Sequence, residues 1–584
     1  MTDRPLRSSR LVRAVAGLAV VALVARLLLL GARPAHFDEG RVAFWTLHYF
    51  ETGEFHYRYA IHGPLIQHVG AALFALVGPS DFVTRLPVAV VGGLLPLSAL
   101  WLRHRLSETE TLALAFFLAA NPVLLYYGRF MRSTVLVAAF CFVAFAAFVR
   151  AYDGFGARYL YLGAASLALG FGAKENAILY VFCWLGAAAL LVDAKLFRLR
   201  GGRSGASWAA DRFDAFADRF RARGVDPRSW VAGWLSHGVG AGLLFSVVVV
   251  FLYAPRGGDW VGLYDALANP LLFPTTLSTT VDQIITGYGY WFGGGGEKTL
   301  TSFIESLGYL LRPVAGYAGP LVGLALAGTA IERYGRGSPR LFVMGCAYWG
   351  LVSIPGYALG TDINNAWILV NALVPLAVPA AVALALVVEV GREALAADDA
   401  VNAGIVGLLL LIVVGSVAGG AIGGVYMNAT EPDNALVQYA QPSAEMRPAV
   451  DRLVAAADAT DGTDALVYDS TGDLVDMDTD APRTPACIKW FNALSLPWYL
   501  EAHDVDVTCA DAPERVPEEL PPVVVVVGDC TLDRTVDCRS QPGAMEPPAE
   551  LADQLDGYER YPYLHRTTGG NDFDGVIVYV DPEA

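Results

Sequence analysis

The sequence predicts a polytopic α-helical membrane protein of about 11 spans, followed by a small external α/β domain. Of its 584 residues, 55% are hydrophobic, and the mean hydropathy is +0.44. Apolar runs of about twenty residues, the length of a bilayer-spanning helix, recur as far as Tyr426. Acidic residues are concentrated after that point. A soluble enzyme core does not show this pattern.

The spans follow from these apolar runs. An odd number of spans places the two termini on opposite sides of the membrane. The first run is expected to be a retained span, because no small-residue cleavage site follows it. Residues 61–78 are also apolar, but Pro64, Gln67 and His68 interrupt them, so we expect a helix along the outer membrane surface. The candidate spans begin near Leu11, Val83, Thr111, Arg132, Tyr159, Ala177, Val231, Val314, Leu341, Trp367 and Ala403.

The distribution of Lys and Arg predicts the orientation. The N-terminus carries Arg4, Arg7, Arg10 and Arg13, and cytoplasmic loops are enriched in basic residues. A cytoplasmic N-terminus places about 21 basic residues inside and about 10 outside. We therefore expect a multi-pass protein of the cell membrane, with residues 1–430 forming the membrane domain and residues 431–584 an extracellular domain.

The tail is strongly acidic. Residues 431–584 hold about 31 acidic and about 9 basic residues, whereas the rest of the chain is slightly basic. Such a surface suits a protein kept soluble at high salt and indicates a salt-loving organism; the alternative is a tail that binds a basic partner. Hydrophobic patterns predict helices at 443–457, 488–501 and 550–561 and strands at 465–468, 505–508, 522–527 and 575–580. The run Val523–Val527 lacks polar alternation, so the sheet should be mostly buried.

Four of the seven cysteines fall in this tail, and the other three lie in spans. Cys487, Cys509, Cys530 and Cys538 lack the spacing of a zinc site. An even number in an external domain predicts two disulfides, whose pairing the spacing does not assign.

Asp38 and Glu39 form the first candidate site, directly after the first span. Charged groups at such a boundary are costly unless they face water, a partner or a substrate. Repulsion should raise the pKa of one carboxyl, which then acts as acid or base while the other stays ionised. His36 precedes the pair and four histidines follow it, which leaves a divalent cation open as a cofactor without assigning its ligands. The alternative is a solvated loop.

Arg129 and Arg132 form the second candidate, with Tyr126 and Tyr127 just before them. Both arginines fall on the predicted external face, where a lipid headgroup lies. The guanidinium group matches phosphate oxygens, so this pair suits a phosphate or diphosphate ligand. The alternative is interfacial anchoring, for which Tyr and Arg are both suited.

Lys174 and Glu175 form the third candidate, because they interrupt an apolar helical hairpin. A charged pair at that depth should face the protein interior, where Lys174 could meet a phosphate and Glu175 could neutralise it in the empty state. Arg85, at the start of a span, is a candidate site residue of the same kind. A structural ion pair is the alternative. No basic, aromatic-interleaved patch indicates a nucleic-acid partner.

Together these motifs resemble the polytopic glycosyltransferases of the C superfamily, which includes the protein O-mannosyltransferases. The resemblance rests on the Asp-Glu pair after the first span, the Arg-Leu-Pro of the next span, and Asn121-Pro122 followed by the Tyr-Arg cluster. His-Phe-Asp-Glu-Gly at 36–40, Tyr-Gly-Arg-Phe-Met-Arg at 127–132 and Gly-Ala-Lys-Glu-Asn at 172–176 look more closely like an archaeal flippase-activity-associated family. The match covers roughly residues 11–200.

The resemblance implies an inverting transferase that works on the external face of the membrane. It would take a sugar from a polyprenyl-phosphate donor and pass it to a lipid-linked glycan or protein acceptor, among membrane lipids. Asp38 would be the base, supported by Glu39, and the donor phosphate would be held by Arg129, Arg132 and Lys174. His36, Arg85 and Glu175 would support the site.

Two other functions stay open from the sequence. The chain could be a non-catalytic accessory of lipid-linked oligosaccharide flipping, as the family label suggests. It could also be a secondary transporter, although the two halves of the chain show no repeated hydropathy pattern.

Overall fold

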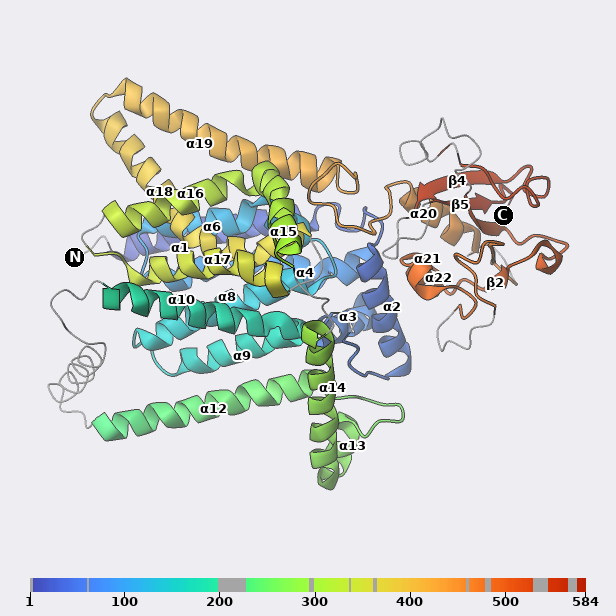
Figure 1. The fold of residues 1–584 in the computed structure, drawn as a ribbon, viewed down its shortest axis with the longest axis horizontal. Coiled ribbons are helices and arrows are strands. Elements are labelled where there is room, and N and C mark those ends of the chain that lie inside the picture. The colour runs from blue at the N-terminus through green and yellow to red at the C-terminus, as the bar shows by residue number, and fades with distance from the viewer. Residues whose placement is uncertain are drawn as a thin grey trace.

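The computed structural model shows a helical bundle with a small mixed α/β domain at one end (Figure 1). The structure describes residues 4–583 apart from 60–61, 198–226, 294–298, 336–337, 361–364, 458, 460–461, 478–484, 529–542, 544 and 566–574. The N-terminus lies at the end of the bundle opposite the C-terminal domain.

Apolar helices make up the bundle. Among the described residues, eight helical segments are long and apolar enough to cross a membrane. They are Asp81–Leu102, Ser133–Tyr152, Glu175–Asp193, Val231–Tyr253, Leu300–Gly335, Leu341–Leu359, Ile368–Ala396 and Ala400–Met427. The helices before the C-terminal domain are α1 (Arg4–Leu27), α2 (Phe37–Thr52), α3 (Pro64–Val77), α4 (Asp81–Leu94), α5 (Ala99–Leu102), α6 (Glu108–Ala120), α7 (Pro122–Tyr127), α8 (Ser133–Tyr152), α9 (Arg158–Ala173), α10 (Ile178–Phe197), α12 (Pro227–Tyr253), α13 (Leu263–Ala268), α14 (Phe273–Gly293), α15 (Leu300–Pro313), α16 (Gly319–Ala330), α17 (Leu341–Gly360), α18 (Leu369–Ala396) and α19 (Ala400–Gly420).

Eight of the predicted spans coincide with these segments, and the other three also fall on helices. The spans expected near Leu11, Thr111 and Tyr159 correspond to α1, to α6 with α7, and to α9. Helices α6 and α9 have only 13 and 16 residues, and α1 carries several arginines. The span expected near Val314 is part of a longer helical segment that begins at Leu300. The short apolar helix expected within 61–78 is α3.

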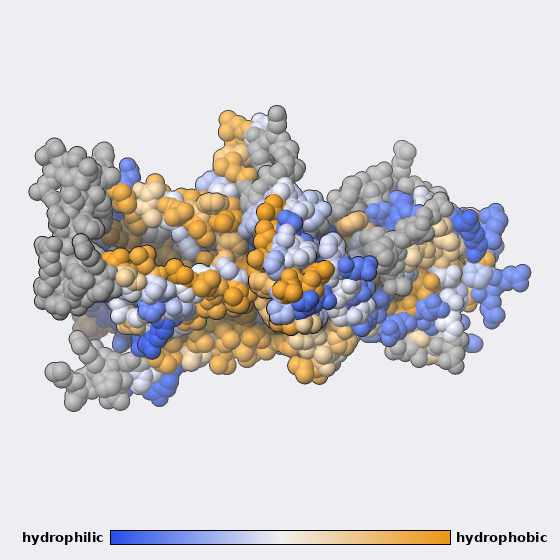
Figure 2. Space-filling view, turned by 90° about the horizontal axis from the view of Figure 1, so that it is seen from below, coloured by the Kyte–Doolittle hydropathy of each residue, from blue (hydrophilic) through white to orange (hydrophobic). Residues whose placement is uncertain are grey.

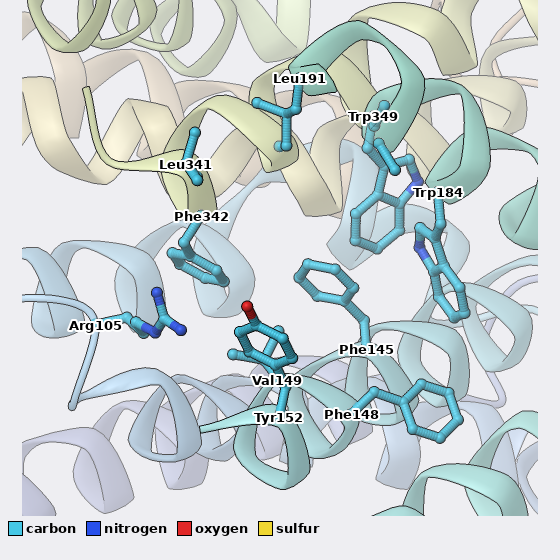
Figure 3. Close-up of a pocket in the computed structure, with 13 residues that line it drawn as sticks. Arg105, Phe145, Phe148, Val149, Tyr152, Trp184, Leu191, Leu341, Phe342 and Trp349 are labelled. Atoms are coloured by element: carbon cyan, nitrogen blue, oxygen red, sulfur yellow. The ribbon is translucent and has the colours of Figure 1, made fainter. Parts of the chain in front are cut away.

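The surface supports a membrane-embedded bundle. Figure 2 shows hydrophobic side chains along the bundle and hydrophilic ones over the C-terminal domain. Exposed leucines and valines along α12 and α19 contribute to the apolar surface. A cavity of about 520 Å³ opens between α8, α10 and α17 (Figure 3). The chain is therefore a multi-pass membrane protein.

The C-terminal domain is built on a five-stranded mixed sheet with the order β2-β1-β3-β5-β4. Strand β1 (Ala465–Tyr468) is parallel to β2 (Val507–Ala510) and β3 (Val523–Val527), whereas β5 (Gly575–Val580) is antiparallel to β3 and β4 (Glu559–Leu564). Nearly every residue of β1, β3 and β5 is buried, as their apolar runs predict. The domain's helices are α20 (Met446–Ala457), α21 (Trp490–Ala493) and α22 (Leu496–Ala502).

Two helix predictions in this domain need correction. The helix predicted at 488–501 is divided into α21 and α22. The helix predicted at 550–561 is wrong: turns precede residue 559, and β4 begins there. Leu551, Leu555 and Tyr558 have helical spacing, but they pack against the sheet from a turn. Pro562 is tolerated in β4 because this strand lies at the sheet edge.

One disulfide joins Cys487 to Cys509, which are 22 positions apart in the sequence. It links the segment before α21 to β2 and confirms that cysteines of the C-terminal tail form a disulfide. Cys530 and Cys538, expected to form the second disulfide, lie outside the described residues. The three span cysteines, Cys141, Cys183 and Cys346, are buried free thiols.

Asp81 joins the membrane domain to the C-terminal domain. Its carboxylate accepts hydrogen bonds from Trp498 Nε1 at 3.0 Å and from the Tyr499 hydroxyl at 2.8 Å. Arg447 Nη1 lies 2.9 Å from the same carboxylate. Because Asp81 opens α4 and its partners belong to α20 and α22, this carboxylate fixes one domain on the other.

We expect Asp81→Ala to loosen this junction. Trp498 and Tyr499 would each lose a buried acceptor, which costs roughly 1–3 kcal/mol. Thermal unfolding of the purified protein and protease cleavage between the domains would measure the loss. Asp451→Ala is the matched control, because Asp451 contacts the same Arg447 but is 52% exposed. The control should change stability by less than about 0.5 kcal/mol, and an equal effect of both variants would contradict this role.

Candidate functional site

The start of α2 places the acidic pair at the end of the bundle that faces the C-terminal domain. His36 caps the helix: its Nδ1 accepts a hydrogen bond from the Asp38 N–H at 3.0 Å. Glu39 completes a capping box by accepting from the His36 N–H at 3.0 Å. The other ring nitrogen of His36 lies 2.7 Å from the Tyr439 carbonyl. This contact makes Nε2 the protonated nitrogen and fixes the ring.

Glu39 is a buried carboxylate whose two oxygens are fully used. Arg85 contacts both oxygens, at 2.9 and 3.1 Å, and Arg33 contacts Oε2 at 2.8 Å. The backbone N–H of Met131 donates to Oε1 at 2.8 Å. Two guanidinium groups and two backbone amides therefore compensate for its burial. Glu39 and Arg85 hold the site together and leave no oxygen for a substrate.

Asp38 points to a different group of residues. Its Oδ2 lies 2.8 Å from Arg132 Nη1, and its side chain is 13% exposed. Arg132 also donates to Gln438 and lies over the Trp367 ring at 5.5 Å. The sequence predicted that these two residues belong to one site, and the structure brings them into direct contact.

The expectation that repulsion raises the pKa of one carboxyl does not hold here. Burial alone raises the pKa of the Asp38 carboxyl, but Arg132 more than offsets this and holds it well below its ordinary range. For Glu39, Arg33 and Arg85 likewise outweigh burial and lower the pKa. Both carboxylates are therefore ionised at neutral pH, because each has its own cation.

Arg129 is not directed at Asp38. Its Nη1 donates to the carbonyls of Ala25 and Arg26 at 3.1 Å, and its Nη2 donates to Leu29 at 3.0 Å. These carbonyls lie at the C-terminal end of α1, where a cation complements the helix dipole. The structure therefore separates the two arginines that the sequence grouped for phosphate binding.

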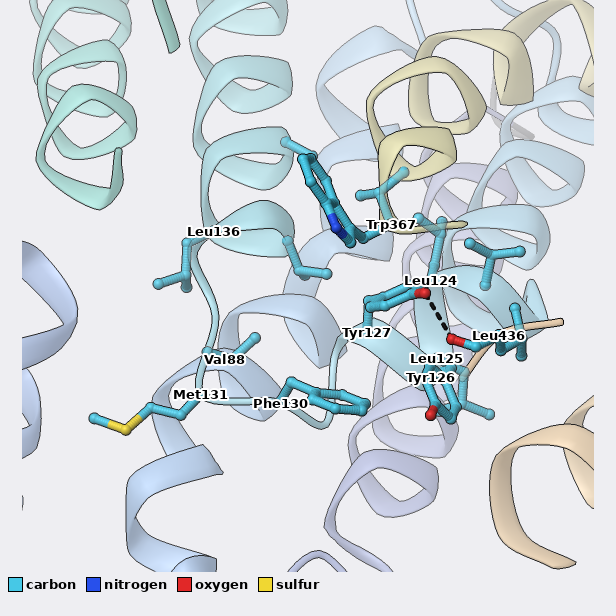
Figure 4. Close-up of a cluster of buried hydrophobic side chains, with 14 of the residues drawn as sticks. Val88, Leu124, Leu125, Tyr126, Tyr127, Phe130, Met131, Leu136, Trp367 and Leu436 are labelled. Carbon is cyan, nitrogen blue, oxygen red and sulfur yellow. Dashed lines mark hydrogen bonds between the residues drawn. The ribbon is translucent and has the colours of Figure 1, made fainter. Parts of the chain in front are cut away.

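An aromatic cluster holds the segment that carries these arginines (Figure 4). Tyr126, Tyr127 and Phe130 are buried, and the Tyr127 hydroxyl donates to the Leu436 carbonyl at 2.7 Å. The Tyr126 hydroxyl donates to Ala429 at 2.8 Å. The tyrosines thus anchor the loop to the segment that follows the last span, rather than to a membrane surface.

Lys174 and Glu175 follow α9, and they face different partners. Glu175 Oε2 accepts a hydrogen bond from the Tyr57 hydroxyl at 2.7 Å, and Glu175 is 1% exposed. Burial lowers the pKa of the Lys174 ammonium, and Glu175, Arg132 and Asp38 are close enough to act on it. Lys174 therefore shares the electrostatic field of the Asp38–Arg132 pair.

His62 is a site residue that the sequence did not single out from the other histidines. Its Nδ1 lies 3.1 Å from the Ser133 hydroxyl, directly after Arg132 in sequence, and the Gly63 N–H donates to Ala173 at 2.9 Å. A side chain at Gly63 would approach the Ala173 backbone to 2.6 Å, so glycine is required at this contact. The only sequence feature that could have distinguished His62 is its position in His62-Gly63-Pro64, directly before a helix.

His62 is buried beside the cations of the site. Burial lowers its pKa well below the ordinary value, and Arg132 and Lys174 lower it further. Its Nε2 is buried and has no hydrogen-bond partner among the described residues. An unsatisfied polar atom at this position suits a substrate that supplies the missing partner.

The remaining histidines of the first external loop are dispersed. His68 lies 2.7 Å from the Leu252 carbonyl, and the ring of His48 packs on Trp45. Within the part of the chain that the structure describes, no group of three or more His, Cys, Asp or Glu side chains could hold a metal ion.

The His36 cap predicts a specific pH dependence of stability. Burial lowers the pKa of His36 to about 4. Below its ordinary pKa of about 6.5, the unfolded chain binds a proton that the folded chain does not, so stability falls by about 3 kcal/mol from pH 6.5 to 4. Thermal unfolding across this range should show a shallower loss in His36→Asn, which keeps a helix cap. The exposed His503→Asn should retain the wild-type slope, and equal slopes in all three proteins would contradict the assignment.

Two family models match parts of the chain. Residues 61–205 match the dolichyl-phosphate-mannose-protein mannosyltransferase model, a stretch that includes His62, Arg132 and Lys174. Residues 446–581 match the Agl23 flippase-associated protein C-terminal domain. No curated protein sequence matches the chain.

Solved structures of ArnT show the same fold, and a third solved structure is less similar. ArnT from Cupriavidus metallidurans in the apo state is similar with a TM-score of 0.52 and 16% identity, covering 97% of each chain. The same protein bound to undecaprenyl phosphate gives a TM-score of 0.53, again at 16% identity and 97% of each chain. The Archaeoglobus fulgidus oligosaccharyltransferase gives 0.48 at 14% identity, over 88% of this chain and 67% of that one. The resemblance drawn from the sequence is thereby confirmed: residues 61–205 match a mannosyltransferase model, residues 446–581 match an Agl23 flippase-associated domain, and the chain has the fold of ArnT.

Proposed function

We propose that this protein is a membrane glycosyltransferase that takes a sugar from a polyprenyl-phosphate donor at the external face. The observation that carries the proposal is the buried Asp38–Arg132 pair, with Lys174 and His62 in the same electrostatic field. A general base beside several cations is what sugar transfer from a lipid phosphate requires. The undecaprenyl phosphate bound to ArnT, which shares this fold, agrees with such a donor.

The cations would act on the leaving group. Sugar transfer breaks the bond between the anomeric carbon and a phosphate oxygen, and negative charge grows on that oxygen. Arg132 and Lys174 would stabilise this charge in a site shielded from water. The unsatisfied Nε2 of His62 would add a contact to a phosphate oxygen or a sugar hydroxyl.

Asp38 would accept the proton of the acceptor hydroxyl. The oxygen of the acceptor hydroxyl then attacks the anomeric carbon from the face opposite the phosphate. This attack inverts the configuration, and the polyprenyl phosphate leaves. Without donor, Arg132 neutralises Asp38 and makes it a weak base. A donor phosphate would compete for Arg132, and the pKa of Asp38 would rise as that contact weakens. Donor binding would thus activate the base.

The other residues implied by the family would position this machinery. Glu39 and Arg85 fix the loop before α2, and His36 caps the helix that carries Asp38. Arg129 holds the end of α1, and Glu175 orients the segment of Lys174 through Tyr57. Their loss would first affect the geometry of the site. The acceptor would be a lipid-linked glycan or a protein, as the resemblance implies.

A non-catalytic accessory of lipid-linked oligosaccharide flipping is the second candidate. The description of the C-terminal domain as flippase-associated favours it. Such a protein would bind the lipid-linked sugar and release it unchanged. Sugar transfer by the purified protein alone would exclude this role, and tight donor binding without transfer to any acceptor would support it.

Asp38→Asn should abolish sugar transfer while preserving the fold. Asparagine has nearly the same shape but accepts no proton, and loss of a general base lowers the rate roughly 10²–10⁴-fold. Transfer from a radiolabelled polyprenyl-phosphate sugar in lipid vesicles is the measurement. Glu51→Gln, an exposed neutralisation on the same helix, should retain wild-type activity. A wild-type rate in Asp38→Asn would exclude Asp38 as the base.

Arg132→Gln and Lys174→Gln should weaken donor binding. Each removes a charged partner of the phosphate, worth roughly 1.5–3 kcal/mol or about 10–100-fold in Kd. Arg129→Gln should instead lower thermal stability and leave the Kd close to wild type, because Arg129 binds backbone carbonyls. Equilibrium binding of polyprenyl phosphate separates these effects. Equal losses of affinity in all three variants would show that Arg129 also binds the donor phosphate.

A further inference from the structure

An apolar cavity lies near the C-terminal end of α8, whereas Asp38 contacts Arg132, directly before the start of that helix. It has a volume of about 520 Å³ and lies between the later turns of α8 and α10 and the first turns of α17. The aromatic rings of Phe145, Phe148, Trp184, Phe342 and Trp349 line it. Its size falls within the range of small-molecule sites in proteins.

This cavity is separate from the candidate site for sugar transfer. Arg132 directly precedes α8, whereas the lining residues Phe145–Tyr152 lie 13 to 20 residues further along. At the rise of an α-helix, this spacing corresponds to roughly 20–30 Å. None of the residues assigned to the donor phosphate lines the cavity.

The cavity leads from the protein surface to a closed inner wall. Tyr152 and Leu341, at one side, are 87% and 42% exposed. Trp349 and Phe342, which form the inner wall, are 1% and 8% exposed. Such an apolar slot with an open side, in a segment that crosses the membrane, is accessible to the hydrocarbon of the bilayer.

Arg105 gives the cavity a cationic edge. Its Nε donates to Asp153 Oδ2 at 2.8 Å, and its Nη2 contacts the other oxygen of that carboxylate. The third nitrogen, Nη1, donates to none of the residues that the structure describes. The hydroxyl of Tyr152 also lines the cavity (Figure 3). Arg and Tyr at the edge of an apolar slot are typical of the membrane interface.

We propose that this cavity binds one hydrocarbon chain of an anionic phospholipid, with the lipid phosphate at Arg105. The chain fills the space between the aromatic rings and restores the dispersion contacts that an empty cavity lacks. Lipid tails are as apolar as the lining and surround the protein, so chain packing alone does not select a lipid. The choice of an anionic headgroup comes from Arg105 Nη1.

The position of the cavity agrees with this ligand. Arg103, Arg105, Arg150 and Arg158 lie at the ends of helices that the basic-residue distribution predicts to be cytoplasmic. Anionic lipids enrich that leaflet and are attracted by basic residues near its surface. The site would bind a lipid of the leaflet opposite to the proposed sugar-transfer reaction, and it does not depend on that function.

Native mass spectrometry of the full-length protein tests this proposal. The protein is extracted from vesicles of equal phosphatidylglycerol and phosphatidylcholine, and the retained lipids are counted. The wild type should retain phosphatidylglycerol in preference. Ala188→Phe, which fills the cavity from α10, should remove most of the retained phosphatidylglycerol. Arg105→Gln should reduce the preference for phosphatidylglycerol over phosphatidylcholine roughly fivefold.

Ala189→Phe is the matched control, because Ala189 is the next residue on α10, is exposed and does not line the cavity. It should retain lipid as the wild type does. Thermal unfolding checks that each variant is folded. Equal retention in Ala188→Phe and Ala189→Phe would overturn the proposal, as would equal retention of both lipids by the wild type. Replacement of phosphatidylglycerol by added polyprenyl phosphate would instead assign the cavity to the donor lipid.

Discussion

The buried carboxylate of Glu39 is the interaction on which the rest of the site depends. A buried charge is costly unless cations and hydrogen-bond donors surround it. Glu39 meets this requirement with Arg33, Arg85 and the backbone of His36 and Met131. These partners belong to the segment between α1 and α2, the helix α4 and the loop before α8. One carboxylate therefore joins three parts of the chain that are distant in sequence: residues 33–39, Arg85 and Met131.

The C-terminal domain covers this arrangement and contributes to it. The Tyr499 hydroxyl accepts from the Ala35 N–H at 2.7 Å, and the Ser495 hydroxyl donates to the Ala35 carbonyl at 2.7 Å. A side chain at Gly40 would lie 2.6 Å from Ser495 Cβ, so only glycine allows the two domains to approach so closely. The ring of Trp490 packs on Phe44 at 4.4 Å. The C-terminal domain is therefore part of the structure that orients Asp38.

Glu39 and Asp38 are adjacent in sequence and have different surroundings. Successive residues on a helix point in directions about 100° apart, so one carboxylate can face the closed centre and the other the open side. The enclosed Glu39 is neutralised on every side. Asp38 forms its ion pair with Arg132 and lies near Lys174 and His62. This difference separates a structural carboxylate from one that is available for chemistry.

The sequence by itself determined the membrane class, the positions of most helices and the presence of a buried sheet in the tail. These features follow from local hydrophobic runs, whose length and periodicity the chain carries directly. It also placed Asp38, Arg132 and Lys174 in one site through their motifs. Only the tertiary structure decided what each of these side chains contacts: Arg129 binds the end of α1, Glu39 joins Arg85, and His62 contacts Ser133, next to Arg132. Residues 549–557 form turns in place of the predicted helix, because their apolar side chains pack against the sheet. Buried polar groups are satisfied by partners that lie far apart in the chain. Such distant contacts also select among the conformations that a short segment can adopt, and the local sequence pattern does not reveal them.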